Sequence, residues 1–220
     1  MKESKAKRYY IGFLSGPTRI SHLHLAWINL VFSLLFYWIT TTYFQTPKFS
    51  LFLILSALYS FFCAIYSLMK KLTYHYKQLS LWLVLSQIIL LLFNLDFMGL
   101  LMFLSPFQND KLLSFQNLPF TVYMSLILVV LLISLACFAN HYRQAKQEQK
   151  EASTKSKLSF AQSGAIIFGI VTSLGGLVTG GVASLFGIVL GISLTILFAA
   201  LIIDSIYTIK WQKENPSAEL

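Results

Sequence analysis

The longest stretch without a charged residue runs for 46 residues, from Leu158 to Ile203. As a single helix it would measure about 69 Å at 1.5 Å per residue, more than twice the hydrocarbon thickness of about 30 Å. The stretch therefore has to reverse direction. Adjacent glycines tolerate the positive φ angles of a tight turn, so the reversal is predicted at Gly180-Gly181.

Four further uncharged runs are long enough to consider as membrane spans: 20–47, 49–69, 78–95 and 112–142. Charged residues make up only 11% of the chain, whereas about 25% is usual in soluble domains. Together with a mean hydropathy of +0.68, this excludes a water-soluble domain, a disordered chain and a coiled coil. Two cysteines in 220 residues also exclude a disulfide scaffold.

The predicted fold class is all-α: a polytopic integral membrane helical bundle with six transmembrane helices in three hairpins. Period-two alternation of polar residues is absent, which argues against a membrane β-barrel. Residues 1–220 are expected to form a single membrane domain. The approximate spans are 24–44, 50–69, 79–104, 119–140, 159–179 and 183–207.

Lysine and arginine are retained on the cytoplasmic side of short-looped membrane proteins. With six spans and both termini cytoplasmic, 15 of the 17 basic residues fall inside, and only Lys48 and Lys111 fall outside. The net charge of +9 is then explained by anionic headgroups on the cytoplasmic side of the bilayer, and no nucleic-acid partner is expected. The short loops and this bias predict a bacterial plasma membrane.

Eight of the 11 glycines lie between Gly164 and Gly191. Small residues four positions apart allow helix backbones to approach closely in lipid. The spacing predicts tight packing of the fifth and sixth helices on each other, with a sliding interface, self-association or contact with another membrane protein as alternatives. The residues of this predicted interface are Gly175, Gly176, Gly180, Gly181, Ala183, Gly187 and Gly191.

Polar residues inside the spans are the candidates for a transport pathway. Asp96 is preceded in the third predicted helix by Asn94 and Gln87, and ionisable groups at membrane depth often mark ion or proton pathways. Asp204 lies near the inner end of the last helix. Both acids are off-centre, so the competing interpretation is that each anchors its helix at the interface.

The segment 141–157 is a predicted cytoplasmic basic connector, and the fourth helix is expected to continue into it. It serves either as a solvated link or as a contact for a cytoplasmic partner or lipid, through Arg143, Lys146, Lys150, Lys155 and Lys157. The four histidines fall on the cytoplasmic side without a metal-binding motif. No metal, cofactor or catalytic residue is expected, and the protein is predicted not to be an enzyme.

Two functions remain. The first is a small transport component, permease-like or a substrate-capture subunit, working with a cytoplasmic or membrane partner. The alternative is a membrane-embedded regulator, immunity or assembly factor that binds another membrane protein through the Gly-rich C-terminal hairpin. Six short-looped helices and Asp96 favour the first, whereas the lack of paired charges along a pathway weakens it. The lack of a cytoplasmic domain weakens the second.

Overall fold

A computed structural model describes residues 18–44, 47–105, 113–114, 116–148 and 181–214. All secondary structure in these ranges is helical, which confirms the all-α prediction for the part described. In chain order the elements are η1 (Ile20–His24), α1 (Leu25–Ile39), η2 (Thr40–Phe44), α2 (Pro47–Leu68), α3 (Lys70–His75), α4 (Lys77–Leu104), α5 (Leu118–Glu148) and α7 (Gly181–Glu214).

Five of these helical stretches are long and apolar enough to cross a bilayer, as expected for a multi-pass membrane protein. The stretches are Ile20–Phe44, Phe49–Leu68, Lys77–Leu104, Leu118–Arg143 and Val182–Glu214. Each overlaps a predicted span, although the last continues well beyond the predicted end at residue 207. The predicted span 159–179 lies outside the described residues.

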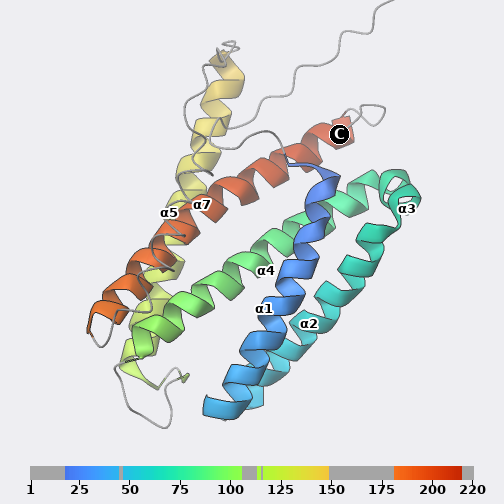
Figure 1. Cartoon of the computed structure of the whole chain (residues 1–220). Coiled ribbons are helices and arrows are strands. Elements are labelled where there is room, and N and C mark those ends of the chain that lie inside the picture. The colour runs from blue at the N-terminus through green and yellow to red at the C-terminus, as the bar shows by residue number, and fades with distance from the viewer. Residues whose placement is uncertain (1–17, 45–46, 106–112, 115, 149–180, 215–220) are drawn as a thin grey trace, which may run out of the picture.

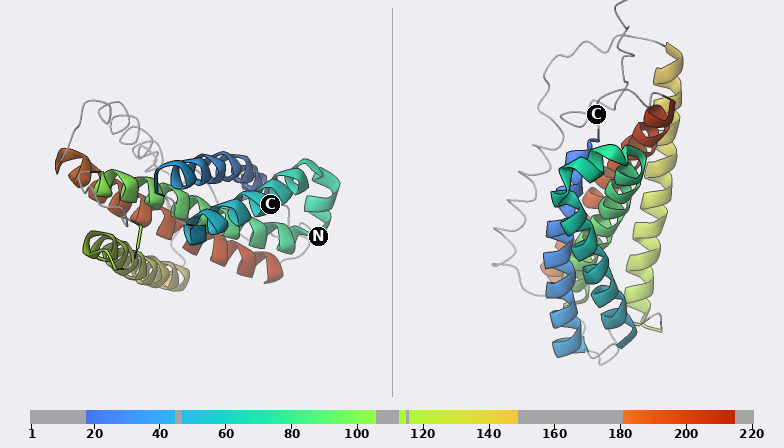
Figure 2. Two further views of the ribbon diagram at one scale, coloured as in Figure 1. Left: turned by 90° about the horizontal axis from the view of Figure 1, so that it is seen from below. Right: turned by 90° about the vertical axis from the view of Figure 1, so that its right-hand side faces the viewer.

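The helices pack in the order α2, α1, α4, α7, α5 (Figure 1). The most extensive contact is between α4 and α7, and the next is between α1 and α2. Figure 2 shows α5 against α7 on the side away from α1. Accordingly, α4 is the most buried of the five spans and α5 the least.

Most buried side chains of the bundle are apolar, and they are centred on α4. Leu81, Val84 and Ile88 pack with residues of α1 and α7 in one half, while Phe97 and Leu100 pack with α1, α2 and α5 in the other. Large apolar side chains also cover the outer faces, including Val31, Phe62 and Leu132. An apolar exterior around an apolar core is what lipid as a solvent requires, so the fold agrees with the composition.

Two pairs of consecutive helices are antiparallel, α1 with α2 and α4 with α5, whereas α5 and α7 run in the same direction (Figure 1). Side-chain contacts near the start of α7 and in its C-terminal third agree with this direction. Ser184, near its beginning, bonds the backbone oxygen of Phe103 at the end of α4, and Asp204 bonds Tyr142 at the end of α5. The third predicted hairpin falls partly outside the described residues.

Nearly all basic residues of the described ranges lie at one end of the bundle, here called the basic end (Figure 1). This end contains the start of α1, the helix α3, the start of α4 and the ends of α5 and α7. Lys48, at the start of α2, lies at the opposite end. The residues of the basic end are Arg19, Lys70, Lys71, Lys77, Arg143, Lys146, Lys210 and Lys213.

Candidate functional site

A set of polar side chains lies between α1, α2 and α4, well inside the apolar spans. We call these five residues the polar seam: Asn29, Ser33, Ser60, Gln87 and Asn94. All five have an exposed fraction of 0%. The spacing explains the alignment, because residues four apart on α1 and seven apart on α4 lie on one face of a helix.

Hydrogen bonds join the polar seam across three helices. Asn29 donates through Nδ2 to the backbone oxygen and to Oε1 of Gln87, both at 2.8 Å. Asn94 donates through its own Nδ2 to Oδ1 of Asn29 at 3.3 Å and to the Ser33 hydroxyl at 3.4 Å. Ser60 donates to Oε1 of Gln87 at 3.4 Å. The contacts of Asn94 and Ser60 are therefore long, and the Asn29–Gln87 pair is the firm one.

Two polar atoms of the seam are left without a well-formed hydrogen bond among the described residues: Oδ1 of Asn94, and Nε2 of Gln87, which lies near the Tyr59 hydroxyl and the Cys63 thiol. One is a double donor and the other an acceptor. A buried polar group without a partner costs about 1–3 kcal/mol, and native structures contain few of them. The seam therefore holds hydrogen-bonding capacity that packing of the described chain does not fully use.

Asp96 lies on the opposite side of α4 from Asn94, because two residues rotate a helix by about 200°. It is half-buried, and both its carboxylate oxygens lie 3.3 Å from the Thr195 hydroxyl of α7. The structure thus brings Gln87 and Asn94 together on the α1 side and places Asp96 apart on the α7 side. The three predicted pathway residues form two separate groups.

Beside Asp96, three glycines allow α4, α7 and α5 to approach closely. A Cβ atom on Gly99 would lie 2.5 Å from the Tyr123 hydroxyl and 2.9 Å from the backbone oxygen of Gly187. On Gly187 it would overlap the backbone oxygen of Gly99 and lie 2.6 Å from the backbone nitrogen of Phe103. On Gly191 it would overlap the Tyr123 hydroxyl. That hydroxyl donates to the Asp96 backbone oxygen at 3.2 Å.

Gly187 and Gly191 of the predicted small-residue interface therefore contact α4 and α5. Their predicted neighbour, the span 159–179, lies outside the described residues, as do Gly175, Gly176 and Gly180. Gly181 begins α7, and Ala183 is half-buried. The glycine spacing indicated close contact, but it did not identify the helix that is contacted.

Asp204 is the centre of a third polar group, at the basic end. Its exposed fraction is 1%, so it is enclosed by protein rather than anchored at the surface. Oδ2 accepts hydrogen bonds from the Thr18 backbone at 2.8 Å and from the Thr18 hydroxyl at 2.6 Å, and Oδ1 accepts one from Tyr142 at 2.7 Å. The Tyr142 ring in turn stacks on Tyr207. This group connects the N-terminal segment, α5 and α7.

The remaining predicted site residues lie in or after the end of α5. Arg143 is exposed, and Lys146 belongs to α5, which continues to Glu148 as the expected extension of the fourth helix. Lys150, Lys155 and Lys157 lie outside the described residues. Within the part of the chain that the structure describes, no three histidine, cysteine or acidic residues are grouped as metal ligands.

Sequence reasoning missed Asn29, Ser33, Ser60 and Thr195 as partners of the predicted residues. A signal existed for Asn29, which is the one amide in its predicted span and is costly there unless paired. No such signal marked the serines and threonine, because hydroxyl groups in spans commonly bond the preceding turn. No protein-family model, curated protein or solved structure matches the chain.

Proposed function

We propose that this protein is a small, non-enzymatic transport component, permease-like or a substrate-capture subunit, in which the polar seam binds a small uncharged polar solute. The observation that supports this is the pair of atoms without a well-formed hydrogen bond to the described chain, Gln87 Nε2 and Asn94 Oδ1, on side chains that are 0% exposed. A donor and an acceptor on one helix face, both in the membrane interior, are costly unless they serve a function.

The class of solute follows from the charges. The seam consists of amide and hydroxyl groups, so a charged solute would remain uncompensated among them. An uncharged solute with donors and acceptors satisfies both Gln87 Nε2 and Asn94 Oδ1 at once. Because the seam is fully buried in this state, access to it requires α1 and α4 to separate, and the long Asn94 contacts are the weakest between those helices.

The topology that we propose has six spans and both termini in the cytoplasm. Two consecutive helices that run in the same direction, as α5 and α7 do, require one crossing between them, which supports the predicted span 159–179. The gathering of Arg19, Lys70 and Lys210 with the other cations at the basic end supports a cytoplasmic location for that end. A bacterial plasma membrane remains part of the proposal.

The predicted alternative, a regulator that binds its partner through the Gly-rich hairpin, receives less support. Gly187 and Gly191 are occupied by α4 and α5 within the chain, so this part of the proposed interface is not available to another protein. We therefore do not propose it as a second function.

Transport is tested in proteoliposomes by measuring permeability to urea, acetamide and glycerol with stopped-flow light scattering. We expect wild-type protein to raise the permeability to at least one of them above that of protein-free liposomes. Asn94→Leu and Gln87→Leu should abolish the increase. Ser86→Ala, on the same helix but outside the seam, should retain it. No increase with any of the three solutes contradicts transport by the chain alone, and an unchanged increase in Asn94→Leu contradicts the polar seam as the solute site.

The partner is tested by native mass spectrometry of protein purified gently from its own membrane. A stoichiometric ATPase supports a subunit of a coupled transporter and draws attention to the segment 141–157 as the contact surface. A co-purifying sensor, regulator or synthase instead supports the alternative function. A homo-oligomer, or the chain alone, supports a self-contained carrier.

A further inference from the structure

The corner between α2 and α4 at the basic end is a well-defined structural element. α2 ends at Leu68, Met69 leaves the helical region with φ −84° and ψ 69°, and α3 begins at Lys70. Backbone bonds from Leu72 and Thr73 to the Met69 oxygen, at 2.9 and 3.0 Å, close the turn. The corner thus joins two spans without a long loop.

Hydrogen bonds hold α3 against the first turn of α4. Thr73 is 3% exposed, and its backbone oxygen accepts a bond from the Ser80 hydroxyl at 2.8 Å. The same Ser80 hydroxyl lies 3.1 Å from the Tyr66 hydroxyl of α2. With one side of α3 fixed in this way, its other side chains are presented outward.

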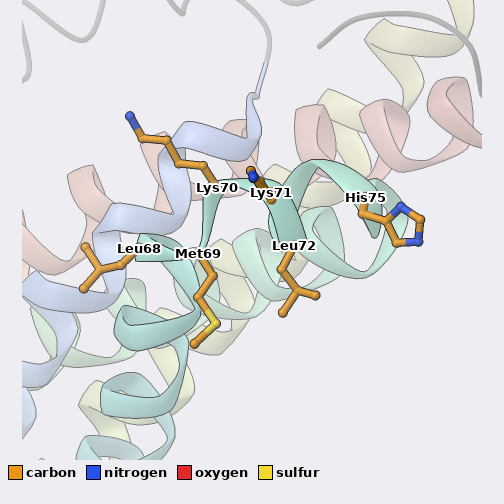
Figure 3. A pocket seen from close by; sticks show the side chains of 6 residues that line it. All are labelled: Leu68, Met69, Lys70, Lys71, Leu72 and His75. Carbon is orange, nitrogen blue, oxygen red and sulfur yellow. The ribbon is translucent and has the colours of Figure 1, made fainter.

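An open hollow of about 680 Å³ lies on the outward side of this corner. Its lining divides by chemistry (Figure 3). Met69 and Leu72 point down from the corner in this view, Leu68 points to the left, and Lys70 points upward, away from Met69 and Leu72. The three apolar side chains are 63%, 52% and 40% exposed, so they are available to a ligand.

The cationic border continues around the corner. His75 lines this hollow and also a neighbouring one, which Lys77 and Lys213 line as well. No acidic residue lines either hollow in the described ranges. The apolar side chains lie next to the last turn of a span, and the lysines lie at the end of the bundle where that span leaves the apolar region.

We propose that this corner is a binding site for one anionic phospholipid, with its phosphate held by Lys70 and Lys71 and its upper acyl chain packed on Leu68, Met69 and Leu72. Charge complementarity selects the anionic lipid, because ammonium groups bind a phosphate as point charges and attract anionic headgroups over zwitterionic ones. In the proposed orientation this lipid belongs to the cytoplasmic leaflet. The proposal is independent of the transport function.

The site is tested by native mass spectrometry of the delipidated full chain titrated with phosphatidylglycerol or phosphatidylcholine. Wild-type protein should bind phosphatidylglycerol more tightly than phosphatidylcholine. Lys70→Gln with Lys71→Gln should weaken the affinity for phosphatidylglycerol on the order of 25-fold, since each lysine at an anionic surface strengthens binding about fivefold. The apolar contact is tested separately by Leu72→Gln, which should weaken binding of the same lipid.

The matched control is Arg143→Gln with Lys210→Gln. It removes the same number of charges from the same end of the bundle, but neither residue lines the hollow. Affinity for phosphatidylglycerol should stay within about twofold of wild type in this control. Equal losses in the two double variants would show general surface attraction and overturn the site, as would equal wild-type affinity for the two lipids.

Discussion

Tyr142, near the end of α5, donates its hydroxyl hydrogen to Oδ1 of Asp204 in α7 at 2.7 Å, across 62 positions of sequence. The other carboxylate oxygen accepts both the backbone and hydroxyl hydrogens of Thr18. One buried carboxylate thus holds the segment before α1 and the end of α5 against α7. Hydrogen bonds to a carboxylate are stronger than those between neutral groups, so this contact stabilises the basic end of the bundle.

Tyr142→Phe should lower the free energy of unfolding by about 1.5–3 kcal/mol, because it removes one donor from a buried carboxylate. Thermal unfolding of the detergent-solubilised protein measures the change. Tyr74→Phe serves as the control, since Tyr74 is 49% exposed, and it should change stability by less than about 0.5 kcal/mol. Equal stability of the two variants would show that the Asp204 contact contributes nothing.

Gly187→Ala should lower the free energy of unfolding by about 1–3 kcal/mol or more. The loss should be larger than that caused by Gly191→Ala. The Cβ of the first would meet the backbone of Gly99 and Phe103, whereas the Cβ of the second would meet the side chains of Tyr123 and Ile127. Backbone has to move as a unit, but a side chain is able to change rotamer. Thermal unfolding measures both variants.

Shortening Tyr123 provides the internal check on that comparison. Tyr123→Phe removes the hydroxyl that the Cβ of Gly191 would overlap, so it should partly restore the stability of Gly191→Ala. It should not restore Gly187→Ala, whose obstruction is backbone. Restoration of both variants, or of neither, would contradict the packing described for α4, α5 and α7.

Asn29 and Gln87 should be energetically coupled. Asn29→Leu leaves the Gln87 side chain without its 2.8 Å donor, so it should be more destabilising than Asn29→Leu made together with Gln87→Leu. A double-mutant cycle on unfolding free energies should give a coupling of about 0.5–3 kcal/mol. A coupling of zero would mean that the firm pair of the polar seam contributes no stability.

Asn94→Leu distinguishes a functional amide from a structural one. It removes two long hydrogen bonds and one unpartnered buried atom, but it leaves Oδ1 of Asn29 without its donor, so the gain and the cost offset each other in part. The melting temperature should therefore change little while solute permeability is lost. A large fall in melting temperature would assign the residue to folding instead.

Asp96→Asn should leave permeability to uncharged solutes close to that of wild type, because Asp96 contacts Thr195 of α7, on the opposite side of α4 from the polar seam. Thr195→Val is the matched control: it removes the hydroxyl 3.3 Å from the carboxylate but keeps the carboxylate itself. Loss of permeability in Asp96→Asn alone would return this carboxylate to the pathway. Loss in both variants would assign the role to the contact rather than to the carboxylate.

Membrane orientation is measured by labelling single cysteines in intact cells with an impermeant maleimide, in a background of Cys63→Ala and Cys137→Ala. Thr41→Cys lies at the end opposite the basic end and is exposed, so it should react. His141→Cys lies at the basic end, is also exposed and should react only after the cells are permeabilised. The reverse pattern would invert the proposed topology.

The polar residues of α4 were recognisable in the sequence, but the side chains that they contact were not. Gln87, Asn94 and Asp96 were all recognisable as polar residues in an apolar span, yet their assignment to different faces and neighbours required the packed structure. Asp204 was recognised too, but its donors are 186 and 62 positions away and no local pattern marks them. Gly99 lies against Gly187, but it is the single glycine of its predicted span, so no small-residue spacing marks it.

The amino-acid sequence alone was enough to predict helical secondary structure, several apolar spans and the gathering of cations at one end, as seen in the described residues. These properties depend on the transfer of each segment from water to lipid, which needs no knowledge of its neighbours. The pairing of helices, and with it the meeting of particular polar groups, is seen only once the helices are packed. Lipid is as apolar as leucine, so hydrophobicity does not select one helix neighbour over another, and backbone approach and hydrogen bonding make that choice.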